Sequence, residues 1–159
     1  IRRWEFFLGK YLKYIVTAAI IVIISYISLI LSSIWLPNVD PAEVYYDEIT
    51  LAFLWMYLFL VTLISTSMLF SSFLDPKKSI SVSLVFFIIF YIIGVYWDLF
   101  TEDIEEIKYI SIFFYYQTGD LLIDHIWEDI WWNMLVLGGY SFISLLISII
   151  IFNKREIPV

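Results

Sequence analysis

The sequence contains four long apolar runs that lack Asp, Glu, Lys, Arg and His. They cover residues 14–36, 50–74, 79–97 and 131–152. As a helix rising about 1.5 Å per residue, each run can cross a hydrocarbon core about 30 Å thick. A β-barrel is disfavoured because the runs are continuous rather than alternating. The sequence therefore predicts an all-α integral membrane protein, with residues 1–159 forming a single transmembrane domain.

The residue types that are missing exclude several classes of chemistry. Hydrophobic residues make up 62% of the 159 residues, and there is no cysteine. Disulfides, thiolate metal sites and cysteine nucleophiles are therefore excluded. There is no phosphate-binding loop and no H-E-x-x-H motif, and a single histidine gives little support for a Ser-His-Asp arrangement. Spans without ionisable side chains argue against a proton pump or an ion-coupled carrier. We expect no enzyme activity on this chain.

The charges between the runs predict the topology. Every Lys and Arg except Lys108 lies in residues 1–13, in the 75–78 turn or after residue 152, whereas most of the acids lie in the other two linkers. Basic residues mark the cytoplasmic side of a membrane protein. We therefore expect a multi-pass protein of the plasma membrane with both termini in the cytoplasm and residues 98–130 on the outer face.

Residues 1–13 have the pattern of a basic amphipathic helix at a membrane surface. One side is apolar, and Phe6 stands on the other side among the charged residues. Two interpretations are open: the helix anchors to anionic lipid head groups, or it offers Phe6 to a cytoplasmic partner. From the residues alone, the lipid anchor is favoured. The apolar side consists of Trp4, Phe7, Leu8, Tyr11 and Leu12, and the polar side of Arg2, Arg3, Glu5, Gly9, Lys10 and Lys13.

Residues 98–130 are too long for a simple turn and keep roughly helical apolar spacing in two places. We expect two short amphipathic helices in the outer leaflet ahead of the last span. Asp124 and Glu128 would then share one helix face, and His125 would share a face with Asp129. A divalent cation could bind to Asp124, His125 and Glu128. A solvated acidic face is the favoured interpretation, because a single histidine among surface acids gives weak support for a metal site.

Small hydroxyl residues recur at helical spacing in three of the spans. Such stripes let helices pack closely in lipid, and this is the favoured interpretation. The alternative is that one stripe lines a permeation path. The residues concerned are Ser25, Ser28, Ser32, Thr62, Ser65, Ser141, Ser144 and Ser148.

Short motifs at both ends of the chain resemble the C-terminal two-thirds of an ABC-2 type permease, the membrane subunit of an ABC exporter. The entry to the first span carries Arg2, Arg3, Glu5, Leu8, Gly9 and Lys10. The last span ends in Phe152 followed by Lys154, Arg155, Glu156 and Ile157. Tyr/Phe-rich residues before a short helix, within 109–122, are similar too. Members usually have two more spans ahead of the Arg-rich helix, so we expect either a fragment or a shortened member.

The resemblance implies a function and partners. Residues Arg2, Arg3, Glu5, Phe6, Gly9 and Lys10 would dock into a separate cytoplasmic ATPase, which favours the docking interpretation of Phe6. The ATPase would bind ATP and magnesium, with no cofactor on this chain. A second permease copy or a paralogue would face this one, with cargo moving between them. The alternatives are a non-transporting membrane scaffold and, least favoured, an outer-face metal site. No nucleic acid partner is expected.

Overall fold

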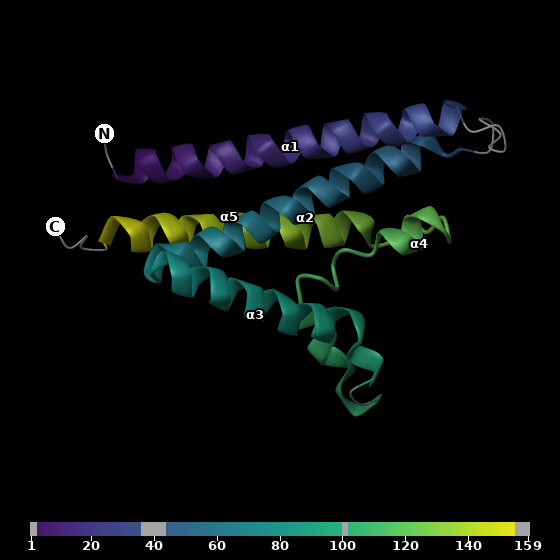
Figure 1. Cartoon of the computed structure of the whole chain (residues 1–159). Coiled ribbons are helices and arrows are strands. Elements are labelled where there is room, and N and C mark those ends of the chain that lie inside the picture. The colour runs from purple at the N-terminus through teal and green to yellow at the C-terminus, as the bar shows by residue number, and fades with distance from the viewer. Residues whose placement is uncertain (1–2, 36–43, 100–101, 155–159) are drawn as a thin grey trace.

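The computed structural model describes residues 3–35, 44–99 and 102–154, with the backbone alone at residues 3, 98 and 102–105. Four long helices dominate this part of the chain: α1 (Arg3–Trp35), α2 (Tyr46–Phe73), α3 (Pro76–Val95) and α5 (Ile130–Lys154). Three short elements lie between α3 and α5 (Figure 1), namely η2 (Trp97–Leu99), η3 (Glu102–Ile110) and α4 (Thr118–Leu122). The four long helices are each long and apolar enough to cross a membrane. The prediction of an all-α membrane protein is therefore confirmed.

The first helix runs without a break through the segment that was expected to lie on the membrane surface. It has 33 residues, which corresponds to about 50 Å at about 1.5 Å per residue. The separate interfacial helix over residues 1–13 is therefore not observed among the described residues. No proline stands between Lys10 and the apolar run, and a glycine at position 9 weakens a helix without ending it.

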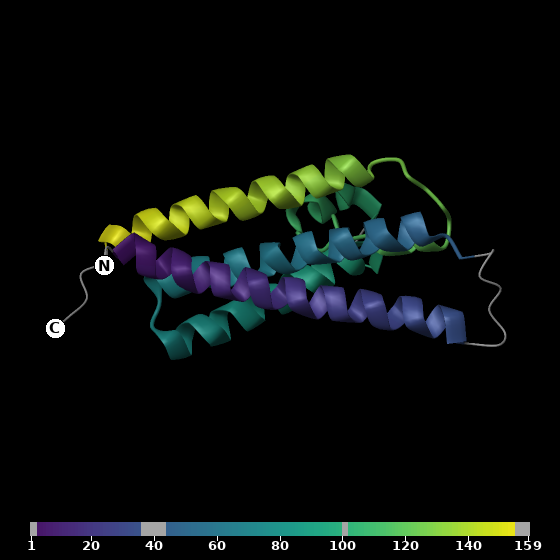
Figure 2. The ribbon, with the colours of Figure 1, turned by 90° about the horizontal axis from the view of Figure 1, so that it is seen from above.

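Helix α2 lies at the centre of the arrangement. It packs most extensively on α5, and α1 and α3 contact it from other sides. The first turns of α1, the α2–α3 turn and the last turns of α5 lie together at one end of the molecule (Figures 1 and 2). We call this the basic end, because Lys10, Lys13, Lys77, Lys78 and Lys154 belong to these segments, and the opposite end the acidic end. Pro76 begins α3, where its missing N–H costs no helical hydrogen bond.

Two clusters of buried side chains hold the helices together. At the acidic end, Trp55 and Phe59 of α2 pack with Ile112, Leu121 and Leu137. At the basic end, Phe7 and Tyr11 of α1 pack with Met68 of α2 and with the end of α5. Long stretches of all four helices remain exposed between these clusters, as expected for surfaces that face lipid.

The segment before the last helix is less helical than its sequence pattern predicts. Within the described part of residues 98–129, only Thr118–Leu122 forms an α-helix, and residues 123–129 form turns and irregular structure. His125 and Asp129 have φ angles of 54° and 61°, a left-handed conformation that interrupts a helix. The amide of Ile126 bonds back to the carbonyl of Asp120 (3.1 Å), which turns the chain out of the helix. The expected shared helix faces of Asp124 with Glu128 and of His125 with Asp129 are therefore wrong.

Candidate functional site

The first turns of α1 present the predicted docking face to solvent. Phe6 is 54% exposed, and the Lys10 ammonium lies 4.6 Å from the centroid of its ring. Glu5 and Gly9 are also exposed, and a Cβ added at Gly9 would meet nothing within 4 Å. Arg2 lies outside the described residues, and the side chain of Arg3 is not described. The observed face is a large aromatic ring with a cation stacked on it, accessible from outside the molecule.

The opposite side of the same turns is held by the protein. Phe7 is 4% exposed, and its ring centroid lies 5.0 Å from that of Phe152 in α5. Tyr11 is also buried, and its hydroxyl is 2.8 Å from Ser65 Oγ of α2. The residues of the apolar side, which the sequence assigned to the membrane surface, therefore have two different environments. Phe7 and Tyr11 pack on protein, whereas Trp4 and Leu12 remain exposed.

The hydroxyl residues of α2 and α5 meet in a polar seam between the two helices. Thr62 Oγ1 lies 2.8 Å from Ser141 Oγ, and the Thr66 hydroxyl donates to the Tyr140 hydroxyl oxygen at 3.4 Å. Ser144 and Ser148 complete the seam on α5, where Ser148 donates to the carbonyl of Ser144 (2.6 Å). The seam residues Thr62, Ser65, Thr66, Ser141, Ser144 and Ser148 are all buried. The seam lies buried between helices of one chain, as expected for hydroxyl residues that let helices pack closely.

The hydroxyl stripe of α1 is exposed, unlike the stripes of α2 and α5. Ser25, Ser28 and Ser32 lie on the half of α1 nearer the acidic end, and all three are exposed. Ser32 donates a hydrogen bond to the carbonyl of Ser28 (2.8 Å), so its hydroxyl is satisfied by its own helix. The structure therefore does not bring this stripe together with the other two.

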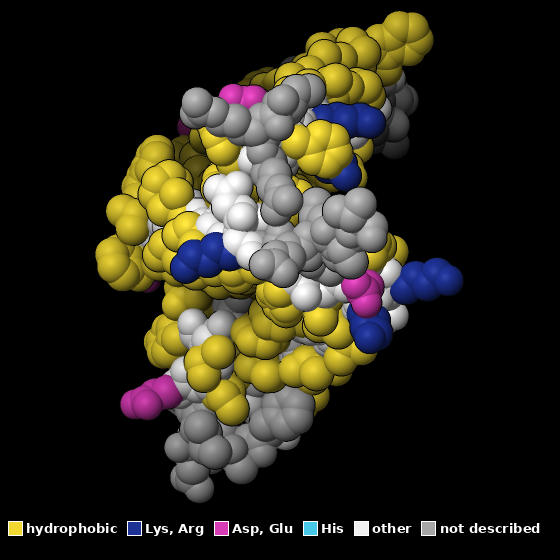
Figure 3. Space-filling model, turned by 90° about the vertical axis from the view of Figure 1, so that its left-hand side faces the viewer, with side chains coloured by type: hydrophobic (Ala, Val, Ile, Leu, Met, Phe, Trp, Pro, Cys, Tyr) yellow, Lys and Arg dark blue, Asp and Glu magenta, His cyan; other side chains and the backbone are white. Residues whose placement is uncertain are grey.

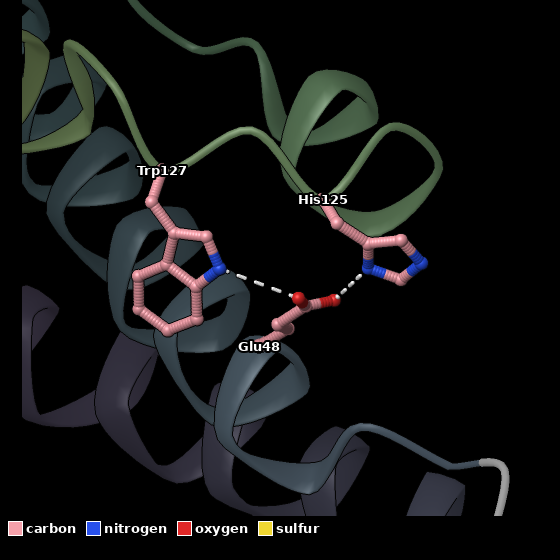
Figure 4. Close-up of polar contacts among 3 residues, drawn as sticks. All are labelled: Glu48, His125 and Trp127. Atoms are coloured by element: carbon pink, nitrogen blue, oxygen red, sulfur yellow. Dashed lines mark hydrogen bonds and ion pairs between the residues drawn. The ribbon is translucent and has the colours of Figure 1, made fainter.

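An unexpected hydrogen-bonded cluster joins α2 to the segment before α5 (Figure 4). Glu48 lies in the first turn of α2 and is 5% exposed. Its carboxylate is 2.7 Å from His125 Nδ1 and accepts a hydrogen bond from Trp127 Nε1 at 3.3 Å. The Tyr45 ring packs against the imidazole of His125, with ring centroids 4.6 Å apart. The sequence showed Glu48 only as one of several loop acids, and no local pattern distinguishes it.

The same geometry does not bring Asp124, His125 and Glu128 together as one group of possible metal ligands. His125 Nδ1 points at Glu48, while Asp124 and Glu128 are exposed. No group of three or more His, Asp or Glu side chains that could hold a metal ion occurs within the described residues. His125 therefore contributes to attachment of this segment rather than to a cluster with its sequence neighbours.

Aromatic side chains fix the remaining part of the acidic end. Trp55 Nε1 donates to the carbonyl of Tyr115 (3.0 Å), and the rings of Phe59 and Tyr116 stack 4.5 Å apart. Burial raises the pKa of the Tyr115 and Tyr116 phenols above the ordinary value of about 10. Both phenols therefore stay neutral and can donate hydrogen bonds at physiological pH.

Comparison with known proteins identifies the family of this chain. A family model described as an ABC-2 family transporter protein matches residues 1–157. The chain belongs to the ABC-2 transporter family. No curated protein and no solved structure matches it. As an ABC-2 family member with four apolar helices, it is a multi-pass membrane protein and a permease component of an ABC transporter. Such a component transports rather than catalyses, and the family works with ABC ATPases as partners.

Proposed function

We propose that this chain is the permease subunit of an exporter in the plasma membrane, driven by a separate cytoplasmic ATPase that binds ATP and magnesium. The observation that carries the proposal is the exposed Phe6 ring beside Lys10, on a helix whose other side is fixed to α2 and α5. An exposed aromatic flanked by cations is typical of an interface anchor. Arg2, Arg3, Glu5 and Gly9 belong to the same docking segment.

The charge distribution supports a cytoplasmic position for this segment. Figure 3 shows the basic end, with lysine side chains standing at several places around it. Positive charge concentrates on the cytoplasmic side of membrane proteins. In this orientation both termini are cytoplasmic, and the Glu48 cluster lies on the outer face.

The contacts of α1 offer a route by which a push on its first turns reaches the rest of the bundle. Because α1 is one helix, displacement of Phe6 moves Phe7 and Tyr11 with it. Phe7 contacts Phe152 of α5, and Tyr11 is hydrogen-bonded to Ser65 of α2. Movement would therefore pass to both helices of the polar seam, as in transitions that shift packed helices between two arrangements.

Cargo would pass between this subunit and a second copy or a paralogue. The exposed hydroxyls of Ser25, Ser28 and Ser32 support the outer half of α1 as a surface that faces this path. The buried hydroxyls of the α2–α5 seam would instead keep each subunit intact during the movement.

The experiment compares Phe6→Asp with Trp35→Asp in the complex purified from membranes together with its ATPase. Both change an exposed aromatic of α1, but Trp35 is 84% exposed at the opposite end of the helix. We expect Phe6→Asp to lower ATPase recovery and stimulated ATP turnover by about tenfold or more, the effect of losing a hot-spot side chain. Trp35→Asp should leave ATPase recovery unchanged.

Unchanged ATPase recovery and turnover in Phe6→Asp would disprove docking at this face. If the complex of chain and ATPase also showed no nucleotide-dependent change in labelling of residues 98–130, the non-transporting scaffold would become the better assignment.

A further inference from the structure

A large groove runs along α3 on the side that faces α2. Its volume is about 900 Å³, and it begins at the basic end next to Tyr14 of α1. Apolar side chains of α3 form one wall, including Leu84, Phe87 and Ile88. Hydroxyl groups accompany them on both helices, from Ser67 and Ser71 of α2 and Ser79 and Ser83 of α3. The groove is therefore apolar along its length but polar near its mouth.

Lys77 precedes the apolar wall on the same face of α3, next to Pro76, which lines the groove, although Lys77 is not itself a lining residue. Helix positions three or four apart, and seven or eleven apart, lie on one face. Lys77 precedes Ile80 by three positions, Leu84 by seven and Ile88 by eleven. All three of these apolar residues line the groove. Lys77 is exposed and has no ion-pair partner in the described part of the chain. The neighbouring Lys78 lies on a different row and is 3.9 Å from Asp75.

The chemistry of the mouth favours an anion. The ammonium of Lys77 and the N-terminal end of α3 both carry positive charge, and helix N-termini attract phosphate groups. Deeper in the groove, the Ser83 hydroxyl is buried and without a hydrogen-bond partner in this structure. A hydroxyl turns about one bond, so Ser83 could donate to an acceptor placed in the groove.

We propose that this groove binds an anionic phospholipid of the cytoplasmic leaflet, with its phosphate at Lys77 and one acyl chain along Leu84 and Ile88. The proposal rests on the orientation given above but on neither the ATPase nor the direction of transport. Basic pockets between transmembrane helices on the cytoplasmic side are known to suit anionic head groups. An apolar helix of a second copy would leave the ammonium and the groove hydroxyls unmatched.

The groove is long enough for this occupant. From Pro76 to Tyr91 it follows α3 for about 22 Å, taking about 1.5 Å per residue. One leaflet contributes about 15 Å of the hydrocarbon thickness of about 30 Å. An extended acyl chain can therefore lie in the groove throughout its depth in the leaflet.

The test uses the full chain, without the ATPase, in nanodiscs of phosphatidylcholine containing a minor fraction of phosphatidylglycerol. In separate samples, phosphatidylglycerol or phosphatidylcholine carries a photoactivatable diazirine in its acyl chain. The labelled residues are then located by mass spectrometry. We expect phosphatidylglycerol to label the groove row of α3 about fivefold more than phosphatidylcholine does, the contribution of about one lysine near an anionic surface. The outward row of Val82 and Val85, which is exposed, should show no such preference.

Two pairs of variants sharpen the test. Lys77→Gln should abolish the preference for phosphatidylglycerol, whereas Lys78→Gln should keep most of it. Leu84→Trp should fill the groove and block labelling of its row, whereas Val85→Trp on the outward row should not. Equal labelling by the two lipids, equal losses in the two lysine variants, or no labelling inside the groove would each overturn the proposal. Because no ATPase is present, these outcomes are independent of the test at Phe6.

Discussion

Helices α5 and α3 both pack on α2, but they do so by different means. The contact with α5 runs along much of both helices and contains buried, hydrogen-bonded hydroxyls such as Thr62 and Ser141. The contact with α3 is smaller and depends on aromatic rings, including Phe70 and Phe86 with centroids 5.2 Å apart. The groove proposed to bind lipid runs along the same two helices and is lined by Met68 and Ser71 of α2 and by Phe87 of α3.

The two kinds of contact differ in how strictly they fix the register of α5 and of α3 against α2. Hydrogen bonds between helices fix one register, because any slip leaves hydroxyl groups unpaired in an apolar environment. Ring packing restricts register less strictly. At its outer end, however, α3 is held by a close contact, since Gly94 meets Ser111 and the backbone of Phe114. Helix α3 is thus fixed at its outer end, and the groove borders most of the rest of its length.

The largest effect is expected at Gly94. A Cβ there would lie 2.5 Å from Ser111 Oγ and 2.9 Å from the Phe114 amide nitrogen, and the backbone cannot move away cheaply. Gly94→Ala should lower the free energy of unfolding by about 2 kcal/mol, measured by denaturation in detergent. Gly139→Ala is the control, because a Cβ there meets nothing within 4 Å. Equal stability of the two variants would show that the outer end of α3 is not fixed by this contact.

The next effect concerns the attachment of the segment that leads into α5. Glu48→Gln keeps the shape of the side chain but removes the charge that accepts bonds from His125 and Trp127. We expect a loss of about 1.5 kcal/mol and faster hydrogen exchange in residues 123–129. Asp47→Asn changes an exposed neighbouring acid and should alter neither quantity. Exchange that is unaffected by Glu48→Gln would argue that this segment is held by its aromatic contacts alone.

The polar seam can be measured directly by a double-mutant cycle on Thr62→Val and Ser141→Ala. Their hydroxyls are 2.8 Å apart and buried, so the coupling energy should be about 1 kcal/mol. The matched control pairs Thr62→Val with Ser81→Ala, since Ser81 is exposed on α3. If both cycles give zero coupling, the contrast between the α5 and α3 contacts loses its energetic basis.

The smallest effect is expected at the link between α1 and α2. Tyr11→Phe removes only the hydroxyl that lies 2.8 Å from Ser65 Oγ and keeps the buried ring. We expect a loss of about 0.6 kcal/mol, the average for interhelical hydrogen bonds in a membrane. Tyr14→Phe is the control, because Tyr14 is exposed on the same helix. A larger loss for Tyr14→Phe would contradict the assigned role of Tyr11.

The helices could be predicted from the sequence because apolar run length is a local property. Residues 50–74 are continuous and uncharged, and most of α2 follows from that, although the helix begins earlier, at Tyr46, and includes Asp47 and Glu48. The hydroxyl stripes of α2 and α5 were recognised by their spacing. Which stripes face each other depends on helix rotation, however, and no single-sequence pattern contains that information. Ser28 and Ser144 look alike in the sequence, yet one is exposed and the other buried.

The parts that could not be predicted depend on contacts between distant residues. Glu48 is buried because His125 and Trp127 reach it across the acidic end, and nothing near position 48 indicates this. The apolar stripe after residue 120 suggested a longer helix, but the turn at Ile126 and the left-handed residues His125 and Asp129 end it. Phe7 was assigned to the membrane surface because the end of α5 was not known to lie beside it.

The length of α1 has a consequence for the membrane itself. At about 50 Å it exceeds a hydrocarbon core about 30 Å thick, and the basic residues of its first turns resist entering that core. A helix of this kind leans more in a thin bilayer and stands straighter in a thick one. Since Phe7 and Tyr11 tie it to its neighbours, the inclination of α1 and the arrangement of the bundle change together, which makes the resting shape of this permease dependent on the lipids around it.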